Sequence, residues 1–386
     1  MSAFITGFGL TKISRDFYST IEDMVYNAVK KMLDQFGNLS FVDTVIVANA
    51  FGYSMQRQNM FSSLISEELG IKGARTFNVE AGQISGHSGL ILADSLIKSG
   101  YSKHVLLIGF EKMSDYNSEV YNSLISQLTN IEYEGIYGST LASNFGIIAR
   151  YYQEKYGLKE EEFASWPILM HENASETYHA QLRFKISTKQ VLESEAVSLP
   201  IRMLHSPPIS DGAAALLISG EDRELVGKEK RVVEIRKGCI SSGTFELSLR
   251  ESLLFFDSLE YARQCYGINA FAEDIAKTEY ISMSDDYTIT AAVIAETIGL
   301  SKKGQFFADI YSGKFRIGDK QMINITGGTK ARGYPIGALG VYEAAEISAM
   351  MSGEKIRSNQ IDLNDAIMIG IGGAGSSSAI LHLTKA

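Results

Sequence analysis

The sequence lacks a membrane-spanning run and has only two cysteines among its 386 residues. No apolar stretch approaches the roughly 20 residues that a helix needs to cross a bilayer. The start, Met1–Gly9, has no basic region and enters a strand pattern at once, so it does not resemble a signal peptide. Cys239 and Cys265 lie outside any CxxC pattern or helix start. This indicates reduced structural thiols in a cytoplasmic protein.

Clustered metal ligands, excess positive charge and long polar tracts are also missing. The six histidines are scattered without ligand spacing, so no metal site is expected. The formal net charge of −9 argues against a general nucleic-acid binder, which is usually basic. Hydrophobic residues make up 45% and charged residues 21%, which is typical of a folded globular protein. The length favours two fused domains of fewer than about 200 residues each.

Apolar, strand-like runs alternate with helical patterns along the chain. Residues 42–49 and 104–109 have the composition of buried strands, and helical patterns lie near residues 59–69 and 88–98. This alternation predicts an α/β sheet whose faces are covered by helices.

The second half of the chain repeats features of the first. Residues 86–95 and 333–345 each open a helix with glycines, and each precedes a strand. Residues 211–218 and 375–383 each place small residues before an apolar run. The repeat predicts an internal pseudo-dyad, with the catalytic loops converging where the halves meet.

We place the two halves at residues 1–222 and 223–386, joined near residues 220–230. A charged, tyrosine-rich region at about residues 114–204 has no equivalent in the second half and is predicted to be an insertion. It is expected to contain a helix over residues 146–156. Long insertions beside a scaffold often carry substrate contacts.

Residues 77–89 run from a short β-like segment into a long amphipathic helix. Backbone N–H groups and the positive end of the helix dipole then point at the turn that holds Gln83. A cysteine at this turn would have a lowered pKa and would attack a thioester. The amide of Gln83 is not a nucleophile. The chain is therefore predicted to suit acyl-thioester chemistry while lacking the atom that begins it.

Six segments in order resemble the thiolase superfamily, specifically the sterol-carrier-type and archaeal thiolases. They are Val79–Ala81, Gly109–Asp115, His171–Ala174, Ser206–Ala215, Asn324–Gly337 and Gly370–Gly375. The resemblance covers nearly the whole chain. It implies the thiolase fold, with two similar βαβαβ-type halves in a five-layered αβαβα core and a loop insertion in the first half. It also implies a homodimer, with a tetramer left open.

Four catalytic loops depart from the family pattern. By the resemblance, the nucleophilic cysteine becomes Gln83, and the polarising histidine or asparagine becomes Ser284. The histidine of Gly-His-Pro becomes Tyr334, and the acid/base cysteine becomes Gly370. Together these replacements predict that thiolysis and Claisen condensation by the usual route are absent.

The resemblance also places the family's oxyanion hole at the backbone N–H groups of Gln83 and Gly372. Backbone donors survive side-chain substitution, although tight packing would equally explain the glycine. The Gln83 side chain either hydrogen-bonds a thioester carbonyl or fills vacated space.

Tyr334, with Tyr287 from an adjacent loop, is a candidate general acid/base. Some thiolase-like aldolases of steroid side-chain degradation are similar in lacking the cysteine and using tyrosines to cleave a β-hydroxyacyl-CoA. The alternative is an aromatic plug in a dead site. Ser284 and Asp285 could orient water and accept a proton, or serve only as turn residues.

Other polar residues near these loops can be interpreted either as site residues or as structural residues. Asp285 and Asp286 do not suggest an acid/base pair, since adjacent strand residues point to opposite faces. His87 either shares a helix face with Gln83 or is a buried structural histidine. His171 and Asn173, in the insertion, are expected to pack a loop or contact an acyl chain.

The sequence thus predicts a thiolase-like protein of lipid metabolism that binds acyl-CoA thioesters without standard acyltransferase activity. Coenzyme A thioesters are the expected ligand, no tightly bound cofactor is expected, and Arg183 and Lys185 are candidate phosphate contacts or solvated charges. The alternatives are a tyrosine-dependent retro-aldol lyase and a non-catalytic scaffold subunit. The resemblance adds a small zinc-ribbon/OB-fold protein as a possible partner.

Overall fold

A computed structural model describes residues 2–220 and 233–386. The first half contains β1 (Phe4–Leu10), α1 (Ile21–Phe36), β2 (Thr44–Ala48), α2 (Gly52–Gln56), α3 (Phe61–Glu68), β3 (Arg75–Val79), α4 (Ser85–Lys98), β4 (His104–Glu111) and β7 (Gly212–Ser219). Between β4 and β7 lie α5 (Ser118–Ile125), α6 (Leu141–Tyr156), α7 (Glu160–Phe163), α8 (Ser165–Ser175), α9 (Thr188–Glu193), β5 (Ala196–Ser198) and β6 (Ile201–Arg202). These elements occupy the region predicted to be an insertion.

The second half contains β8 (Val233–Ser242), α10 (Asp257–Tyr266), α11 (Ile268–Lys277), β9 (Tyr280–Met283), α12 (Thr288–Thr297), α13 (Phe306–Tyr311), β10 (Met322–Ile323), α14 (Leu339–Ser352), β11 (Asp365–Gly372) and β12 (Ser377–Lys385). The predicted boundary between residues 222 and 223, and most of the predicted junction, lie outside the described residues.

Ten strands pair in the order β10-β9-β11-β12-β8-β1-β7-β4-β2-β3. Each half therefore has the same internal order, with its first, fifth, fourth, second and third strands side by side. The two halves join where β1 pairs antiparallel with β8, at Phe4 with Glu234 and Ile5 with Val233. The repeated strand order gives the architecture that the internal sequence repeat predicts.

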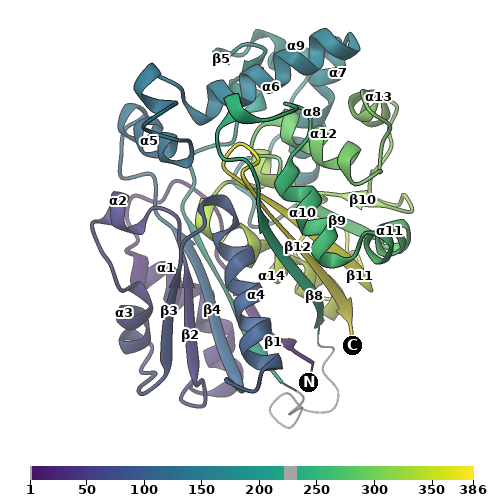
Figure 1. Cartoon of the computed structure of the whole chain (residues 1–386). Coiled ribbons are helices and arrows are strands. Elements are labelled where there is room, and N and C mark those ends of the chain that lie inside the picture. Colours follow the sequence, from purple (N-terminus) through teal and green to yellow (C-terminus); the bar gives the residue numbers. More distant parts are fainter. Residues whose placement is uncertain (1, 221–232) are drawn as a thin grey trace.

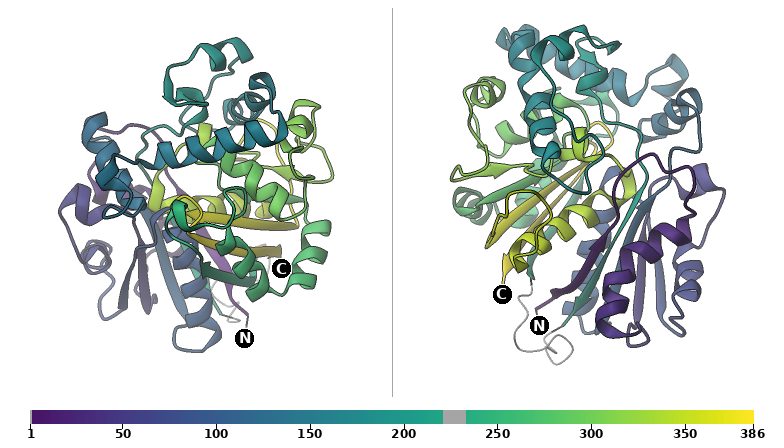
Figure 2. Two further views of the ribbon diagram at one scale, coloured as in Figure 1. Left: turned by 45° about the horizontal axis from the view of Figure 1, so that its top comes forward. Right: turned by 180° about the vertical axis from the view of Figure 1, so that it is seen from behind.

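Helices and strands form five layers (Figure 1). The helices α4 and α14 lie between the strands of the two halves and share one apolar core with both. Helix α1 covers the outer face of the first half, and α10 lies on the outer side of the second. Helices α5 to α9 gather at the end where the parallel strands β2, β4, β9 and β11 terminate (Figures 1 and 2).

The predicted strands at residues 42–49 and 104–109 correspond to β2 and β4, and the helices near residues 59–69 and 88–98 correspond to α3 and α4. Two helices begin earlier than their sequence patterns indicate. Helix α4 begins at Ser85, whose hydroxyl accepts a hydrogen bond from Ala81 N at 2.8 Å. Helix α6 begins at Leu141 because Thr140 and Ser143 form a reciprocal capping box. In the described part of the chain, no helix combines the length and apolar character needed to cross a bilayer.

Helices α4 and α14 are built alike and meet near their N-terminal ends. Each has 14 residues and follows a three-residue 3-10 turn, at Gly82–Ile84 and Ile336–Ala338. A Cβ atom on Gly86 would lie 2.9 Å from the backbone nitrogen of Gly340, and one on Gly340 would collide with the backbone of His87. Only glycine permits this approach, which brings the turns before both helices to one place.

Glu111, the last residue of β4, fixes the same junction. Its buried carboxylate accepts hydrogen bonds from Ala50 N at 3.0 Å and Phe51 N at 3.1 Å in the first half. It also accepts one from Gly337 N, at 2.8 Å, in the second half. Burial raises its pKa to about 7 against the lowering effect of these backbone bonds. One side chain thus satisfies donors from both halves.

We predict that Gly86→Ala lowers the free energy of unfolding by about 1–3 kcal/mol, as is typical of overpacking against atoms that cannot move aside. The matched control is Gly89→Ala in the same helix, where the atoms nearest to an added Cβ are side-chain atoms of Leu107, Ile46 and Ala48. Chemical denaturation measures both changes. Equal stabilities of the two variants would contradict the proposed helix contact.

Candidate active site

Gln83 lies in the interior, in the 3-10 turn between β3 and α4. Its side-chain Oε1 accepts a hydrogen bond from Gly373 N at 2.8 Å, and its Nε2 donates to Gly373 O at 3.3 Å. The amide is therefore bonded twice to the backbone just after β11. This geometry fits a side chain that holds two loops together.

The two predicted oxyanion-hole residues are brought together. A Cβ atom on Gly372 would lie 3.4 Å from Ile84 Cγ1 and 3.5 Å from Ala81 O. The end of β11 therefore runs beside the turn that carries Gln83. Their joint use as donors to a developing oxyanion stays a prediction.

Tyr334 forms a buried pair with Asp286. The Tyr334 hydroxyl donates to Asp286 Oδ2 at 3.1 Å, and both side chains are 1% exposed. The Gln83 side chain lies close enough to the Asp286 carboxyl to lower its pKa. Asp286 Oδ1 has no hydrogen-bond partner among the described residues. Three residues far apart in sequence thus form one polar cluster, which we call the Tyr334 cluster.

The electrostatics of the Tyr334 cluster follow from its burial. Burial, followed by the charge of Asp285, raises the pKa of Asp286 to about 8. Burial and the neighbouring Asp286 also raise the pKa of the Tyr334 phenol well above its usual value. A carboxyl with a pKa of about 8 is suited to accept and release a proton near neutral pH, as a general acid/base does. The sequence analysis did not select Asp286, although it lies within the Ser284–Tyr287 loop.

Asp285 takes different partners from its neighbour. It accepts hydrogen bonds from Thr329 N at 2.6 Å, Thr329 Oγ1 at 2.7 Å and Trp166 Nε1 at 3.1 Å. Asp286 faces Tyr334 instead. The two carboxyls therefore have separate hydrogen-bond partners, although they follow β9 and do not lie in a strand as the sequence argument assumed.

Ser284 and Tyr287 flank this loop at the end of β9. The Ser284 hydroxyl accepts a hydrogen bond from Ile371 N at 2.9 Å, which ties β9 to β11. The ring of Tyr287 stacks on Phe145 of the insertion, with ring centroids 4.9 Å apart. Both side chains are buried. Ser284 has a clear packing role, and Tyr287 connects the loop to the insertion.

Tyr121, on α5 of the insertion, is a further phenol beside the Tyr334 cluster. Burial raises its pKa, and the charges of Tyr287 and Asp286 add to the shift. Tyr121 in turn contributes to the raised pKa of Tyr334. The sequence indicated it only through the high tyrosine content of the insertion.

His87 fills the space beside Gly370. A Cβ atom on Gly370 would lie 2.8 Å from His87 Cε1 and Nδ1, so any larger residue there would collide with the imidazole. His87 Nε2 lies 3.2 Å from Glu343 Oε2 on α14. His87 is therefore buried between α4, α14 and β11, as the structural interpretation expects.

The remaining insertion residues do not join the Tyr334 cluster. Asn173 donates to Asn324 O at 3.2 Å, and His171 Nδ1 lies 2.9 Å from Phe184 O, so both hold loops. Arg183 lies over the ring of Tyr178, and Lys185 is exposed. In the part of the chain that the structure describes, neither cation hydrogen-bonds or ion-pairs with the Tyr334 cluster.

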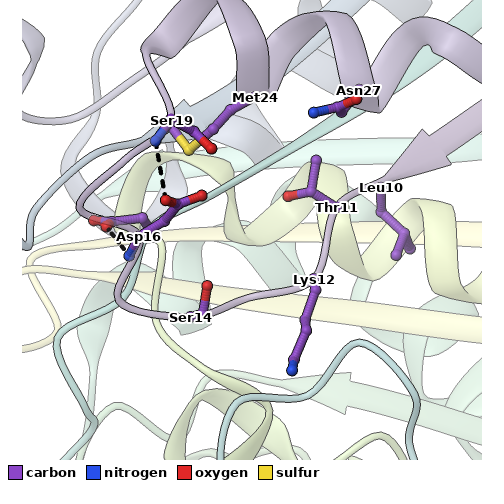
Figure 3. Close-up of a pocket in the computed structure, with 9 residues that line it drawn as sticks. Leu10, Thr11, Lys12, Ser14, Asp16, Ser19, Met24 and Asn27 are labelled. Carbon is purple, nitrogen blue, oxygen red and sulfur yellow. Dashed lines mark hydrogen bonds between the residues drawn. The ribbon is translucent and has the colours of Figure 1, made fainter.

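One cavity, of about 300 Å³, lies beside the start of α1 (Figure 3). Asp16 N donates to Asp211 Oδ2 at 2.8 Å, and Ser19 N donates to Asp16 Oδ1 at 3.0 Å in its wall. No predicted site residue lines it. Across residues 2–220 and 233–386, no three histidine, cysteine, aspartate or glutamate side chains form a group suited to a metal ion.

Comparison with known proteins identifies the family to which this chain belongs. Residues 2–196 match the thiolase N-terminal domain, and residues 245–385 match the thiolase C-terminal domain-like family. The chain belongs to the thiolase family. This confirms the resemblance found from sequence motifs and the thiolase fold that it implied.

Two curated relatives show how far this thiolase-family chain has diverged. It is 31% identical to an acetyl-CoA acetyltransferase of Methanocaldococcus jannaschii, over 97% of both chains. It is 29% identical to human sterol carrier protein 2, over 96% of this chain and 70% of the relative.

Solved structures agree on the fold. The Ltp2-ChsH2(DUF35) aldolase superposes with a TM-score of 0.83 at 18% identity, covering 100% of this chain and 98% of that one. Human mitochondrial 3-ketoacyl-CoA thiolase superposes with a TM-score of 0.74 at 15% identity, covering 100% and 99%. Both likenesses concern the fold.

We predict that Asp286→Asn stabilises the protein more at pH 8 than at pH 5. The folded pKa of about 8 lies above the usual aspartate value, so the folded state holds a proton that the unfolded state releases between about pH 4 and pH 8. Wild-type stability should therefore fall across this window relative to the variant, by at most about 1.4 kcal/mol per pH unit. Asparagine keeps the shape and has no proton to lose.

Denaturant titrations from pH 4 to pH 9 measure this difference. Asp34→Asn, on the exposed surface of α1, is the control for removing a carboxylate. A pH-independent difference between wild type and Asp286→Asn would show that Asp286 is not held protonated in the fold.

Proposed function

We propose that this thiolase-family protein binds an acyl-CoA thioester and does not form a covalent acyl-enzyme. The main support is the state of Gln83, which the family pattern aligns with the nucleophilic cysteine. Its amide is non-nucleophilic and bonds twice to Gly373. The buried pair near Gln83 is the Tyr334 phenol and the Asp286 carboxyl, which are groups suited to proton transfer and not to nucleophilic attack on a thioester.

Acyl-CoA is the favoured ligand class because relatives handle it. The archaeal relative is named an acetyl-CoA acetyltransferase, and an Ascaris suum thiolase of the same fold has been solved in complex with coenzyme A. In this chain the helix α4 still directs its N-terminal end toward the turn of Gln83. A thioester oxygen is the natural partner for such donors.

Within this proposal, the Tyr334 cluster favours a retro-aldol lyase. The substrate would be a β-hydroxyacyl-CoA. Asp286, acting through the Tyr334 hydroxyl, takes the proton of the β-hydroxyl group as its oxygen forms a carbonyl. The Cα–Cβ bond breaks, and its electron pair moves to the thioester as an enolate. The proton then returns to Cα, releasing a shorter acyl-CoA and an aldehyde or ketone.

This reaction needs enolate stabilisation and proton transfer but no nucleophile and no oxidant. The backbone N–H groups of Gln83 and Gly372 would bind the enolate oxygen. The Asp286 pKa of about 8 lets the carboxyl both accept and return a proton near neutral pH. A protein of the same fold is named an aldolase, so the fold is compatible with this class of reaction.

We propose that the protein is a cytoplasmic homodimer. The aldolase structure is named with a DUF35 subunit, and a small partner of that kind is proposed for this chain too. A non-catalytic scaffold subunit is the competing function. Calorimetry with CoA and acyl-CoAs separates the two, because a scaffold would not bind them.

We predict that incubation with acetyl-CoA leaves no acetyl adduct in the intact mass spectrum. Gln83→Cys alone should restore little thiolase rate, because Tyr334 and Gly370 also replace catalytic partners and such groups act as a unit. A condensation assay with two acetyl-CoA molecules measures this. An adduct on the peptide around Gln83, or turnover at a rate typical of thiolases, would refute the proposal.

We predict that Tyr334→Phe lowers kcat for β-hydroxyacyl-CoA cleavage by roughly 10²–10⁴-fold, the usual contribution of a positioned acid/base. Wild-type kcat/KM should rise with pH and level off above about pH 8, as Asp286 ionises. Asp286→Asn should remove this rise. Tyr133→Phe, at an exposed tyrosine of the insertion, is the matched control. Full activity of Tyr334→Phe would exclude the assigned role.

A further inference from the structure

A second cavity, also of about 300 Å³, opens between α8, the segment after α13 and the loop after α14. None of the residues of the Tyr334 cluster lines it. Its polar wall is made by Lys185, Arg316, Arg357, Glu172, Glu176, Asn173 and Asn359. The topology thus collects three cationic side chains from three separate segments.

Arg357 is the unusual member of this wall. It is only 2% exposed, and its Nε and Nη1 atoms are buried with no hydrogen-bond partner among the described residues. Within that part of the chain it also has no carboxylate at ion-pair distance. Burial lowers its pKa, and the charge of Glu176 opposes that effect. A guanidinium stays charged in proteins, so leaving it unpaired in the interior is costly.

The other charged side chains of the cavity wall do not neutralise the charge of Arg357. Arg316 pairs with Glu172 at 2.9 Å, so these two charges cancel. Lys185 is exposed at the cavity and forms no ion pair in the described residues. Glu176 is the one carboxylate in the wall that remains to balance Lys185 and Arg357. The cavity therefore carries one uncompensated positive charge.

We propose that this cavity binds an oxyanion, specifically a phosphate group. Phosphate oxygens accept several charge-assisted hydrogen bonds at once, and Arg357, Lys185 and the Asn359 amide could all donate to one tetrahedral group. The cavity is large enough to admit it together with part of a larger molecule. The phosphate belongs either to coenzyme A or to a free or differently esterified phosphate. The site does not depend on the proposed acyl chemistry.

Isothermal titration calorimetry with inorganic phosphate tests the proposal, at ionic strength held constant with chloride. The wild-type protein should bind phosphate saturably. Arg357→Gln should weaken binding about tenfold or more, the usual effect of losing a hydrogen bond to a charged group. Lys185→Gln, at an exposed position, should weaken it about threefold without affecting the fold. Arg150→Gln, at an exposed position of α6, removes a cation elsewhere and should leave phosphate binding unchanged.

Competition identifies the source of the phosphate. If coenzyme A displaces phosphate and dephospho-CoA does not, the cavity holds the 3′-phosphate of the cofactor. If neither displaces it, the ligand is another phosphate. Both results support the site.

The proposal is overturned if phosphate shows no binding beyond chloride, or if both Arg357→Gln and Lys185→Gln bind as wild type does. Should Arg357→Gln fail to fold, Lys185→Gln alone decides. Acyl-CoA binding by Tyr334→Phe is measured in a separate experiment. If the proposed acyl-CoA site is wrong, the phosphate titrations still test the cavity.

Discussion

The close approach of α4 and α14 at Gly86 and Gly340 is the constraint on which the candidate active site depends. Both helices are buried between the strands of the two halves, and their backbones nearly touch beside their first turns. Any larger side chain at either glycine would separate them. The separation would part the Gln83 turn from the loop that carries Tyr334. Glu111 reinforces the junction by accepting backbone donors from both halves.

This packing leaves little room for polar groups that are not satisfied. Gln83 meets the requirement by pairing with both backbone groups of Gly373, whereas His87 meets it only at Nε2, which lies 3.2 Å from Glu343 Oε2. Further along the α14 side, Glu346 lies 2.9 Å from Arg332 and 2.6 Å from His179, so a buried arginine is matched by carboxylates. Asp286 is also only half satisfied: its Oδ1 has no hydrogen-bond partner among the described residues, as is true of His87 Nδ1 and Arg332 Nε. Asp286 differs from these two groups in that its other oxygen is bonded to a phenol, Tyr334.

Arg357, at the second cavity between α8, the segment after α13 and the loop after α14, also lacks the partners that a comparable buried residue has. Arg332 and Arg357 are both almost fully buried, but Arg332 has two carboxylate neighbours and Arg357 has none at ion-pair distance in the described chain. A fold that matches one buried arginine and leaves the other open to a cavity has a place for an external anion. The Tyr334 cluster and the second cavity, which Arg357 lines, are thus two separate polar sites in one fold.

Local sequence was sufficient for much of the architecture. The strands at residues 42–49 and 104–109 and the helix ending at Lys98 follow from apolar runs and apolar periodicity, which reflect the buried faces of each element. The internal repeat follows from glycines and small residues at matching places in the two halves. The family motifs identified the loops of Gln83, Ser284 and Tyr334. Helix starts at Ser85 and Leu141 were placed too late, because capping depends on polar residues that lie outside the apolar pattern.

Tertiary structure decided which side chains of these loops contact one another. Asp286 looked unpromising beside Asp285, and only the fold showed that it faces Tyr334, 48 residues away in sequence. Arg357 and Lys185 belong to different segments and share a cavity only through the packing of the loops around α8. By itself, the sequence determined the elements, the repeat and the absence of a nucleophile at position 83, because these depend on residue identity and short-range periodicity. Charge pairing and burial depend on long-range contacts, so the polar sites emerged only from the folded chain.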